Sequence, residues 1–83
     1  MSDLRDLVEI VAHALADEPQ RVTVTEVEHH GTTLIEVSVA PPDVGKLIGR
    51  QGRTIAAMRT LAGAAAERSG RRVAVEVRDS AAD

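Results

Sequence analysis

The segment GKLIGRQG, residues 45–52, constrains the fold of this chain most strongly, because it breaks a helical pattern that resumes beyond it. Three glycines fall within these eight residues, although glycine in a helix interior costs about 1 kcal/mol relative to alanine. The residues before the break predict a short helix over residues 44–48, and the apolar spacing after it predicts a longer helix over residues 53–69. Gly70 is expected to end the second helix.

The residues before this helix pair predict one more helix and two strands. Apolar side chains recur at helical spacing over residues 3–16, and Ser2 is suited to cap that helix. Two runs rich in β-branched residues, 21–28 and 32–40, alternate in polarity on either side of the turn HHG. Together they predict a β-hairpin.

The chain beyond the hairpin predicts one more cap and one more strand. The prolines within residues 41–43 lack the N–H group that a central strand donates, and Asp43 is expected to cap the helix over residues 44–48. Residues 71–78 alternate in polarity again, so they predict a third strand whose valines face the core.

These elements follow the order α-β-β-α-α-β and predict an α+β fold with helices packed on one face of a three-stranded sheet. We expect one domain over residues 1–78 and a flexible C-terminal tail over residues 79–83. Since the chain has 83 residues and no cysteine, its stability depends on aliphatic packing, alone or with a second subunit. No apolar run approaches the roughly 20 residues that span a bilayer, and no signal-peptide pattern opens the sequence, so a cytoplasmic protein is expected.

Charged residues are distributed unevenly along the chain. Residues 1–44 carry nine acidic and two basic side chains, whereas residues 45–78 carry eight basic and two acidic ones. Such an asymmetry favours a polyanionic partner, with an ordinary solvated surface as the alternative. The chain has no aromatic residue, so a nucleic-acid site built from it would hold bases on aliphatic or guanidinium surfaces.

Two interpretations of the glycine segment follow from the residues themselves. Gly49 and Gly52 can serve only a tight turn, because glycine adopts φ angles that other residues disfavour. Alternatively, the turn presents the free amides and positive dipole end of the following helix to a phosphate backbone, beside Lys46, Arg50 and Arg53. A P-loop is excluded, because its Gly-Lys pair must be followed by Ser or Thr.

The stretch VGKLIGRQGRTIAAMRTL, residues 44–61, resembles the signature of KH domains. It contains the apolar V-G-x-x-I-G lead-in, the GxxG loop as GRQG, and a helix that opens with Arg-Thr-Ile. Two strands before the helix pair and one after it are typical of the type II arrangement. The resemblance covers residues 2–78, an extent similar to that of the small stand-alone bacterial KH proteins called KhpA.

This resemblance implies binding of single-stranded RNA without catalysis, as an RNA chaperone or post-transcriptional regulator. In KH domains the GxxG loop holds the nucleotide backbone while the bases lie over an apolar groove. The RNA-binding residues that the resemblance implies are Lys46, Ile48, Gly49, Arg50, Gln51, Gly52, Arg53, Thr54 and Ile55. For Ile55, an ordinary place in the core is the simpler interpretation. The resemblance also implies a homodimer, or a heterodimer with a larger KH-domain protein.

Two other functions remain open: a protein-interaction subunit that binds RNA only incidentally, and a ribosome- or rRNA-associated assembly factor. No nucleophile, base and orienting residue are patterned to act together, so neither an enzyme nor a cofactor is expected. His29 and His30 share the hairpin turn without further ligands, so no metal site is expected. How far Arg71, Arg72 and Arg78 extend the positive surface is left open by the sequence.

Overall fold

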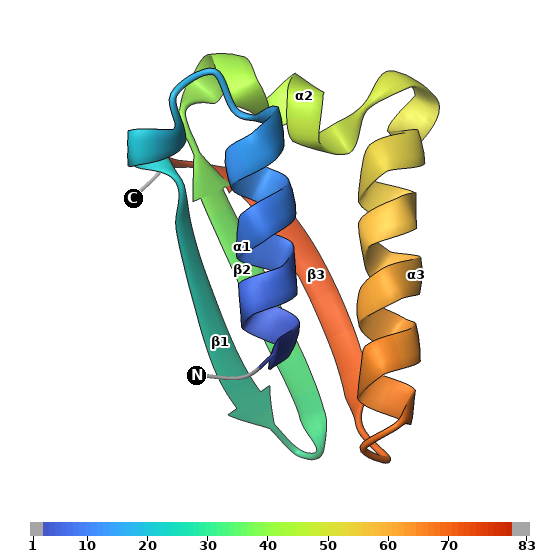
Figure 1. The fold of residues 1–83 in the computed structure, drawn as a ribbon. Coiled ribbons are helices and arrows are strands. Elements are labelled where there is room, and N and C mark those ends of the chain that lie inside the picture. Colours follow the sequence, from blue (N-terminus) through green and yellow to red (C-terminus); the bar gives the residue numbers. More distant parts are fainter. Residues whose placement is uncertain (1–2, 81–83) are drawn as a thin grey trace.

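In the computed structural model of this chain, which describes residues 3–80, three strands form one sheet and the helices cover a single face of it (Figure 1). In chain order, the elements are α1 (Asp3–Leu15), β1 (Thr23–His29), β2 (Thr32–Val39), α2 (Val44–Ile48), α3 (Arg53–Glu67) and β3 (Arg72–Asp79). Short 3-10 turns lie at Pro19–Arg21, Pro41–Asp43 and Arg50–Gly52. The predicted α+β class and the order of helices and strands are confirmed, and both match the type II KH arrangement.

The strand order in the sheet is β1-β2-β3, so β2 lies in the centre. β1 and β2 are antiparallel, and the turn between them places His30 and Gly31 at positive φ angles of 49° and 79°. Positive φ at both central positions matches the twist of the two strands. β3 pairs with β2 in parallel, because the chain passes through α2 and α3 before it returns to the sheet.

The core lies between the helices and the inward face of the sheet. The inward-facing residues of β2 are all fully buried, as their alternation predicts: Thr33, Ile35, Val37 and Val39. The buried residues from the helices are Leu4, Val8, Ala12, Leu47, Ile55, Met58, Ala62 and Ala66. Because the chain lacks Phe, Tyr and Trp, every apolar side chain of this core cluster is aliphatic or a methionine.

Each of the three strands differs from its predicted bounds by one or two residues at one or both ends. β1 begins at Thr23 rather than at residue 21, because the 3-10 turn Pro19–Arg21 occupies the start of the predicted run. β3 extends to Asp79, which pairs with Val39, so the first residue of the predicted tail belongs to the sheet. Ser2 and residues 81–83 lie outside the described residues, so the cap at Ser2 and the flexible tail stay predictions.

Asp43 does not cap α2, which corrects the sequence-based prediction. Its backbone already has helical angles, φ −89° and ψ −12°, whereas a capping side chain needs an extended backbone to reach the first-turn amides. Its buried carboxylate, 1% exposed, instead accepts hydrogen bonds from the amides of Asp17 at 3.1 Å and Glu18 at 3.0 Å. Asp43 therefore ties the segment after α1 to the start of α2.

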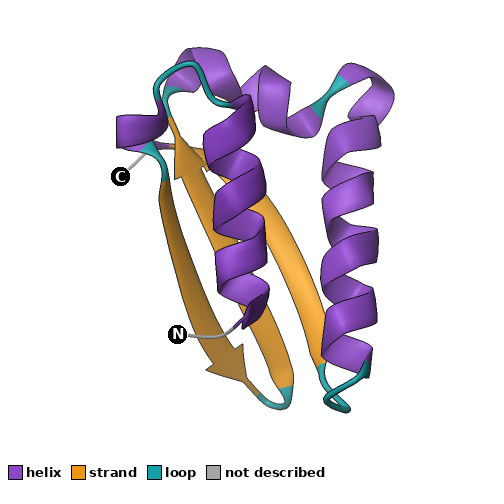
Figure 2. Ribbon diagram, in the orientation of Figure 1, coloured by secondary structure: helices purple, strands orange, loops and turns teal. Residues whose placement is uncertain are grey.

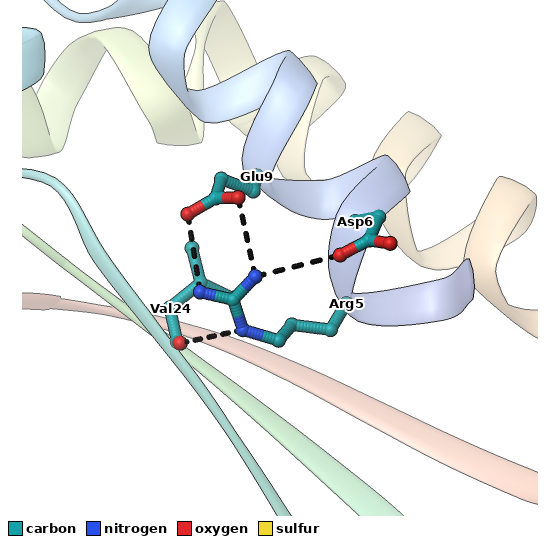
Figure 3. A network of polar contacts seen from close by, with 4 residues as sticks. All are labelled: Arg5, Asp6, Glu9 and Val24. Atoms are coloured by element: carbon teal, nitrogen blue, oxygen red, sulfur yellow. Dashed lines mark hydrogen bonds and ion pairs between the residues drawn. The ribbon is translucent and has the colours of Figure 1, made fainter. Parts of the chain in front are cut away.

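A cluster of polar contacts fastens α1 to the edge strand β1 (Figure 3). Arg5 Nε donates to the carbonyl oxygen of Val24 at 3.0 Å, and its two terminal nitrogens donate to the two carboxylate oxygens of Glu9, each at 3.1 Å. Asp6 Oδ1 lies 3.5 Å from Arg5 Nη1. The hydrogen bonds from Arg5 hold the pKa of Glu9 below its ordinary value.

Candidate nucleic-acid interface

The predicted break between α2 and α3 is present at residues 49–52 (Figure 2). Gly49 has φ 79° and ψ 168°, Gln51 has φ 56° and Gly52 has φ 72°. For an L-residue such as Gln51, the left-handed region costs about 1–2 kcal/mol. The surrounding fold therefore holds this loop in a conformation that its sequence does not favour locally.

The two glycines of the loop are required for different reasons. A Cβ atom on Gly49 would lie 2.7 Å from Cβ and 2.8 Å from the amide nitrogen of Thr54, and would collide with the Thr54 hydroxyl as well. A Cβ atom on Gly52 would meet nothing within 4 Å, so only its positive φ angle requires glycine. Gly49 thus lets the loop fold back on α3, while the surface around Gly52 stays open to a ligand.

The loop also determines how the N-terminus of α3 is presented. The amides of Gly52 and Arg53 are already used within the loop, because they donate to the carbonyl oxygens of Gly49 and Arg50. The N-cap residue of α3 is Gly52, so no capping side chain covers the first-turn amides, and no acidic residue lies in that turn. The positive end of the helix dipole is therefore left uncompensated, which favours an anion there.

Cationic and amide side chains lie over this helix end. Arg50, Gln51 and Arg53 are all exposed, and Arg53 Nη2 donates to Gln51 Oε1 at 3.0 Å. Because Gln51 orients one nitrogen of Arg53, the other donors of that guanidinium remain available. The loop thus brings together five of the predicted RNA-binding residues: Gly49, Arg50, Gln51, Gly52 and Arg53.

Lys46, another predicted RNA-binding residue, is paired with a carboxylate outside the loop. Its Nζ forms an ion pair and hydrogen bond with Asp17, which follows α1. The hydrogen bond that Lys46 donates to Asp17 is the main reason that the pKa of Lys46 is raised above its ordinary value. The structure therefore shows a cation beside the loop whose charge is already matched by a carboxylate.

The apolar residues implied by the resemblance are unequally accessible. Ile55 is 5% exposed and belongs to the core, as the simpler interpretation of the sequence has it. Ile48 is half-buried against the core at the end of α2. Thr54 is half-buried and packs beneath Gly49. Of these three side chains, Ile48 and Thr54 offer surface beside the loop.

Arg59 is a cation near this surface that was not among the predicted RNA-binding residues. It lies seven residues after Gly52, which is about two helical turns, so both residues face the same side of α3. Arg59 is exposed, and its Nε donates to the carbonyl oxygen of Val75 in β3 at 3.2 Å. Its helical phase relative to the loop is readable in the sequence, but its contact with a strand is not.

The arginines at the ends of β3 mainly contact the sheet. Arg71 Nη2 lies 3.2 Å from Glu28 Oε1 and 3.6 Å from Glu26 Oε2. Arg78 Nε donates to Ser38 Oγ at 3.1 Å. Arg72 is exposed, beyond the end of α3 that is opposite the loop.

The described residues contain neither a cluster of metal ligands nor a helix that could span a membrane. Across residues 3–80, no three His, Cys, Asp or Glu side chains gather as a metal site would need. His29 and His30 contact each other edge to face, with ring centroids 4.2 Å apart. None of the helices in this part of the chain has the length and apolar character of a membrane span.

Sequence comparisons relate the chain to one family. The family model described as KhpA/KhpB, KH domain, matches residues 5–77. A protein of Caldanaerobacter subterraneus subsp. tengcongensis named RNA-binding protein KhpA is 49% identical over 72 residues, covering 87% of this chain and 96% of that protein. Proteins of the same name from Aquifex aeolicus and Clostridium perfringens are 44% and 43% identical, covering 93% and 89% of this chain and 98% and 99% of theirs.

A solved structure supports the fold independently. The chain superposes with a TM-score of 0.62 and 22% identity on part of Era, whose crystal structure contains MgGDPNP and nucleotides of 16S ribosomal RNA. The match covers 92% of this chain but only 29% of the Era chain. At this identity the likeness concerns the fold alone.

Proposed function

The chain belongs to the KhpA/KhpB KH-domain family, and from that premise we propose that it binds single-stranded RNA at the loop between α2 and α3. It acts as an RNA chaperone or post-transcriptional regulator in the cytoplasm and catalyses no reaction. The names of its relatives support the ligand class. The observation that carries the proposal is the loop itself, in which positive φ angles hold Arg50 and Arg53 exposed over an uncapped helix end.

In this function the loop holds the sugar-phosphate backbone rather than the bases. With no side chain on Gly52 and open space around it, the backbone can approach the start of α3 closely. Arg50 and Arg53 supply charge to the phosphates, while the bases lie toward Ile48 and Thr54. Such contacts read little sequence, so broad specificity is expected.

The direct test is filter binding of cellular RNA at low salt to the natural chain and to a variant with Arg50→Asp and Gln51→Asp. We expect the variant to bind at least about tenfold more weakly, because like charges then face the RNA. A matched control is Arg68→Asp with Ser69→Asp, which makes the same charge change at the other end of α3. Equal retention of the loop variant and the natural chain would reject this site.

A second candidate function, pairing with another KH chain, is favoured by the outer faces of the helices. Leu61 is 53% exposed on α3, and Ile10 is 68% exposed on α1. Ala57 and Ala64 lie one turn on either side of Leu61 and are also exposed. This apolar face suits a second copy of the chain or a larger KH-domain protein, with RNA binding then incidental.

Light scattering at micromolar concentration tests this pairing. A homodimer predicts twice the monomer mass, and Leu61→Glu is expected to restore the monomer, because a charge cannot be buried unpaired in the contact. A clean monomer mass for the natural chain contradicts homodimerisation. A pull-down of a larger KH-domain protein that survives the loop substitutions but not Leu61→Glu would favour the interaction role.

The class of RNA bound would distinguish a regulator of transcripts from a ribosome-associated factor. A ribosome- or rRNA-associated assembly factor would use the same loop on a different target. Crosslinking followed by sequencing of the bound RNA separates these targets, since rRNA fragments would dominate for an assembly factor and diverse transcripts for a regulator.

A further inference from the structure

Lys46 and Asp17 meet beside the RNA-binding loop although 29 residues separate them in the sequence. Lys46 lies in α2, two residues before Ile48, where that helix leads into the loop. The side chain of Lys46 is 46% exposed and that of Asp17 is 72% exposed, so the ion pair is on the surface and open to solvent. The pair is therefore accessible to a polyanion.

The position of Asp17 is set by a buried carboxylate. Both oxygens of Asp43 are engaged: Oδ1 accepts from the amide of Asp17 at 3.1 Å, and Oδ2 accepts from the amide of Glu18 at 3.0 Å. Asp43 directly precedes α2, so these bonds fix the backbone of Asp17 relative to the helix that carries Lys46. The pair thus joins one mobile lysine to a carboxylate on an anchored backbone, which reduces the entropy that the pairing costs.

We propose that Asp17 is an internal competitor for RNA phosphate at Lys46, held in place by Asp43. The inference rests on the proposed function of the loop. A carboxylate and a phosphate oxygen make the same charge-assisted hydrogen bond to an ammonium group, so only one of them takes this site on Lys46 at a time. In the natural chain Arg50 and Arg53 contact phosphates, while Lys46 remains with Asp17.

The surface position of the pair makes the competition measurable. An exposed ion pair contributes little to folding stability, so removing it leaves the fold intact. The consequence lies in the number of phosphates that the protein neutralises. For single strands, each such phosphate changes the slope of log K against log salt concentration by about 0.7.

The experiment measures RNA affinity across a salt series for the natural chain, Asp17→Asn, Lys46→Met and the double variant. We expect Asp17→Asn to bind more tightly at low salt and to steepen the slope by about 0.7, because Lys46 then contacts one more phosphate. Lys46→Met alone should leave affinity and slope nearly unchanged. In the Asp17→Asn background, Lys46→Met should remove the whole gain.

A matched control separates competition from a general effect of net charge. Glu67→Gln also removes one negative charge, but at the end of α3 that is remote from the loop. The proposal is overturned if Glu67→Gln steepens the slope as much as Asp17→Asn does. It is also overturned if Lys46→Met weakens the natural chain as much as it weakens Asp17→Asn.

These outcomes are distinct from failure of the proposed function. If the natural chain binds no RNA, or if the Arg50→Asp and Gln51→Asp variant binds as well as it does, the loop site is rejected and the competition falls with it. If the loop variant is weakened but Asp17→Asn matches the natural chain, the loop site stands and the competition alone is rejected.

Discussion

Gly49 and Gly52 should differ in how much an added side chain destabilises the fold. Gly52→Ala should reduce the free energy of unfolding by about 1–2 kcal/mol, since only its left-handed φ angle is at stake. Gly49→Ala should cost more than that, because φ 79° with ψ 168° is a glycine region and the new Cβ also collides with Thr54. Urea unfolding of both variants gives the two values.

The collision at Gly49 can be tested separately from its φ angle. Thr54→Ala removes the hydroxyl, but Cβ and the amide nitrogen of residue 54 stay at 2.7 and 2.8 Å from the added atom. The double variant Gly49→Ala with Thr54→Ala should therefore remain about as unstable as Gly49→Ala. Recovery of stability in the double variant would show that the hydroxyl alone causes the clash.

The buried carboxylate of Asp43 holds the segment after α1 against the start of α2, the helix that leads into the loop. Asp43→Ala should reduce the free energy of unfolding by about 2–4 kcal/mol, because the amides of Asp17 and Glu18 lose their acceptors. Asp43→Asn should cost less, since one side-chain oxygen still accepts. Equal losses for the two variants in urea unfolding would contradict this explanation.

Single residues also show where sequence reasoning reaches its limit. The break between the helices was predictable, because three glycines and three cations within residues 45–53 are a local signal. The roles of Asp43 and Lys46 were not, because their partners lie 25–29 residues away and only the fold brings them together. Capping chemistry was the nearest local explanation for Asp43, and it was wrong.

At the scale of elements, the contact of α1 with β1 should depend on pH through Glu9. Hydrogen bonds from Arg5 lower the pKa of Glu9 in the folded chain, so their contribution to stability is present above the ordinary pKa of a glutamate. It is lost as the pH falls through the lower folded pKa. Glu9→Gln should therefore lower the melting temperature at pH 7 and approach the natural chain in acid.

A second Glu→Gln variant serves as the control for this pH effect. Glu67 is exposed at the end of α3, so Glu67→Gln should follow the natural chain closely at every pH. A constant difference between Glu9→Gln and the natural chain from neutral to acidic pH would contradict the role of the ionised carboxylate.

Elements were more predictable than the contacts between them. Periodicities of 3.6 and 2 residues predicted α1, α3 and the three strands, because a fold with one covered sheet face imposes them directly. The short α2 was predicted instead from its place between Asp43 and the glycine break. The predicted start of β1 was wrong, because Pro19 begins a 3-10 turn that extends to Arg21. Arg59 was missed because its hydrogen bond joins α3 to β3, and no local pattern reports such a contact.

For the whole molecule, folding rearranges the charge asymmetry of the sequence. Three of the eight basic residues in 45–78 pair with carboxylates from the first half of the chain: Lys46, Arg71 and Arg78. Within residues 3–80, the other five have no carboxylate at salt-bridge distance: Arg50, Arg53, Arg59, Arg68 and Arg72. These unmatched arginines lie at the loop, along α3 and just beyond its end, so the positive surface follows one helix.

The salt dependence of RNA binding shows how much of this surface is used. If phosphates contact only Arg50 and Arg53, log K should fall with log salt at a slope of about 1.4, whereas contact with all five arginines would give about 3.5. We expect the smaller slope, because only the loop adds an open helix end to its cations. Arg53→Gln should then lower the slope by about 0.7 and Arg68→Gln should leave it unchanged. A slope near 3.5, reduced equally by both substitutions, would instead place the RNA along the whole of α3.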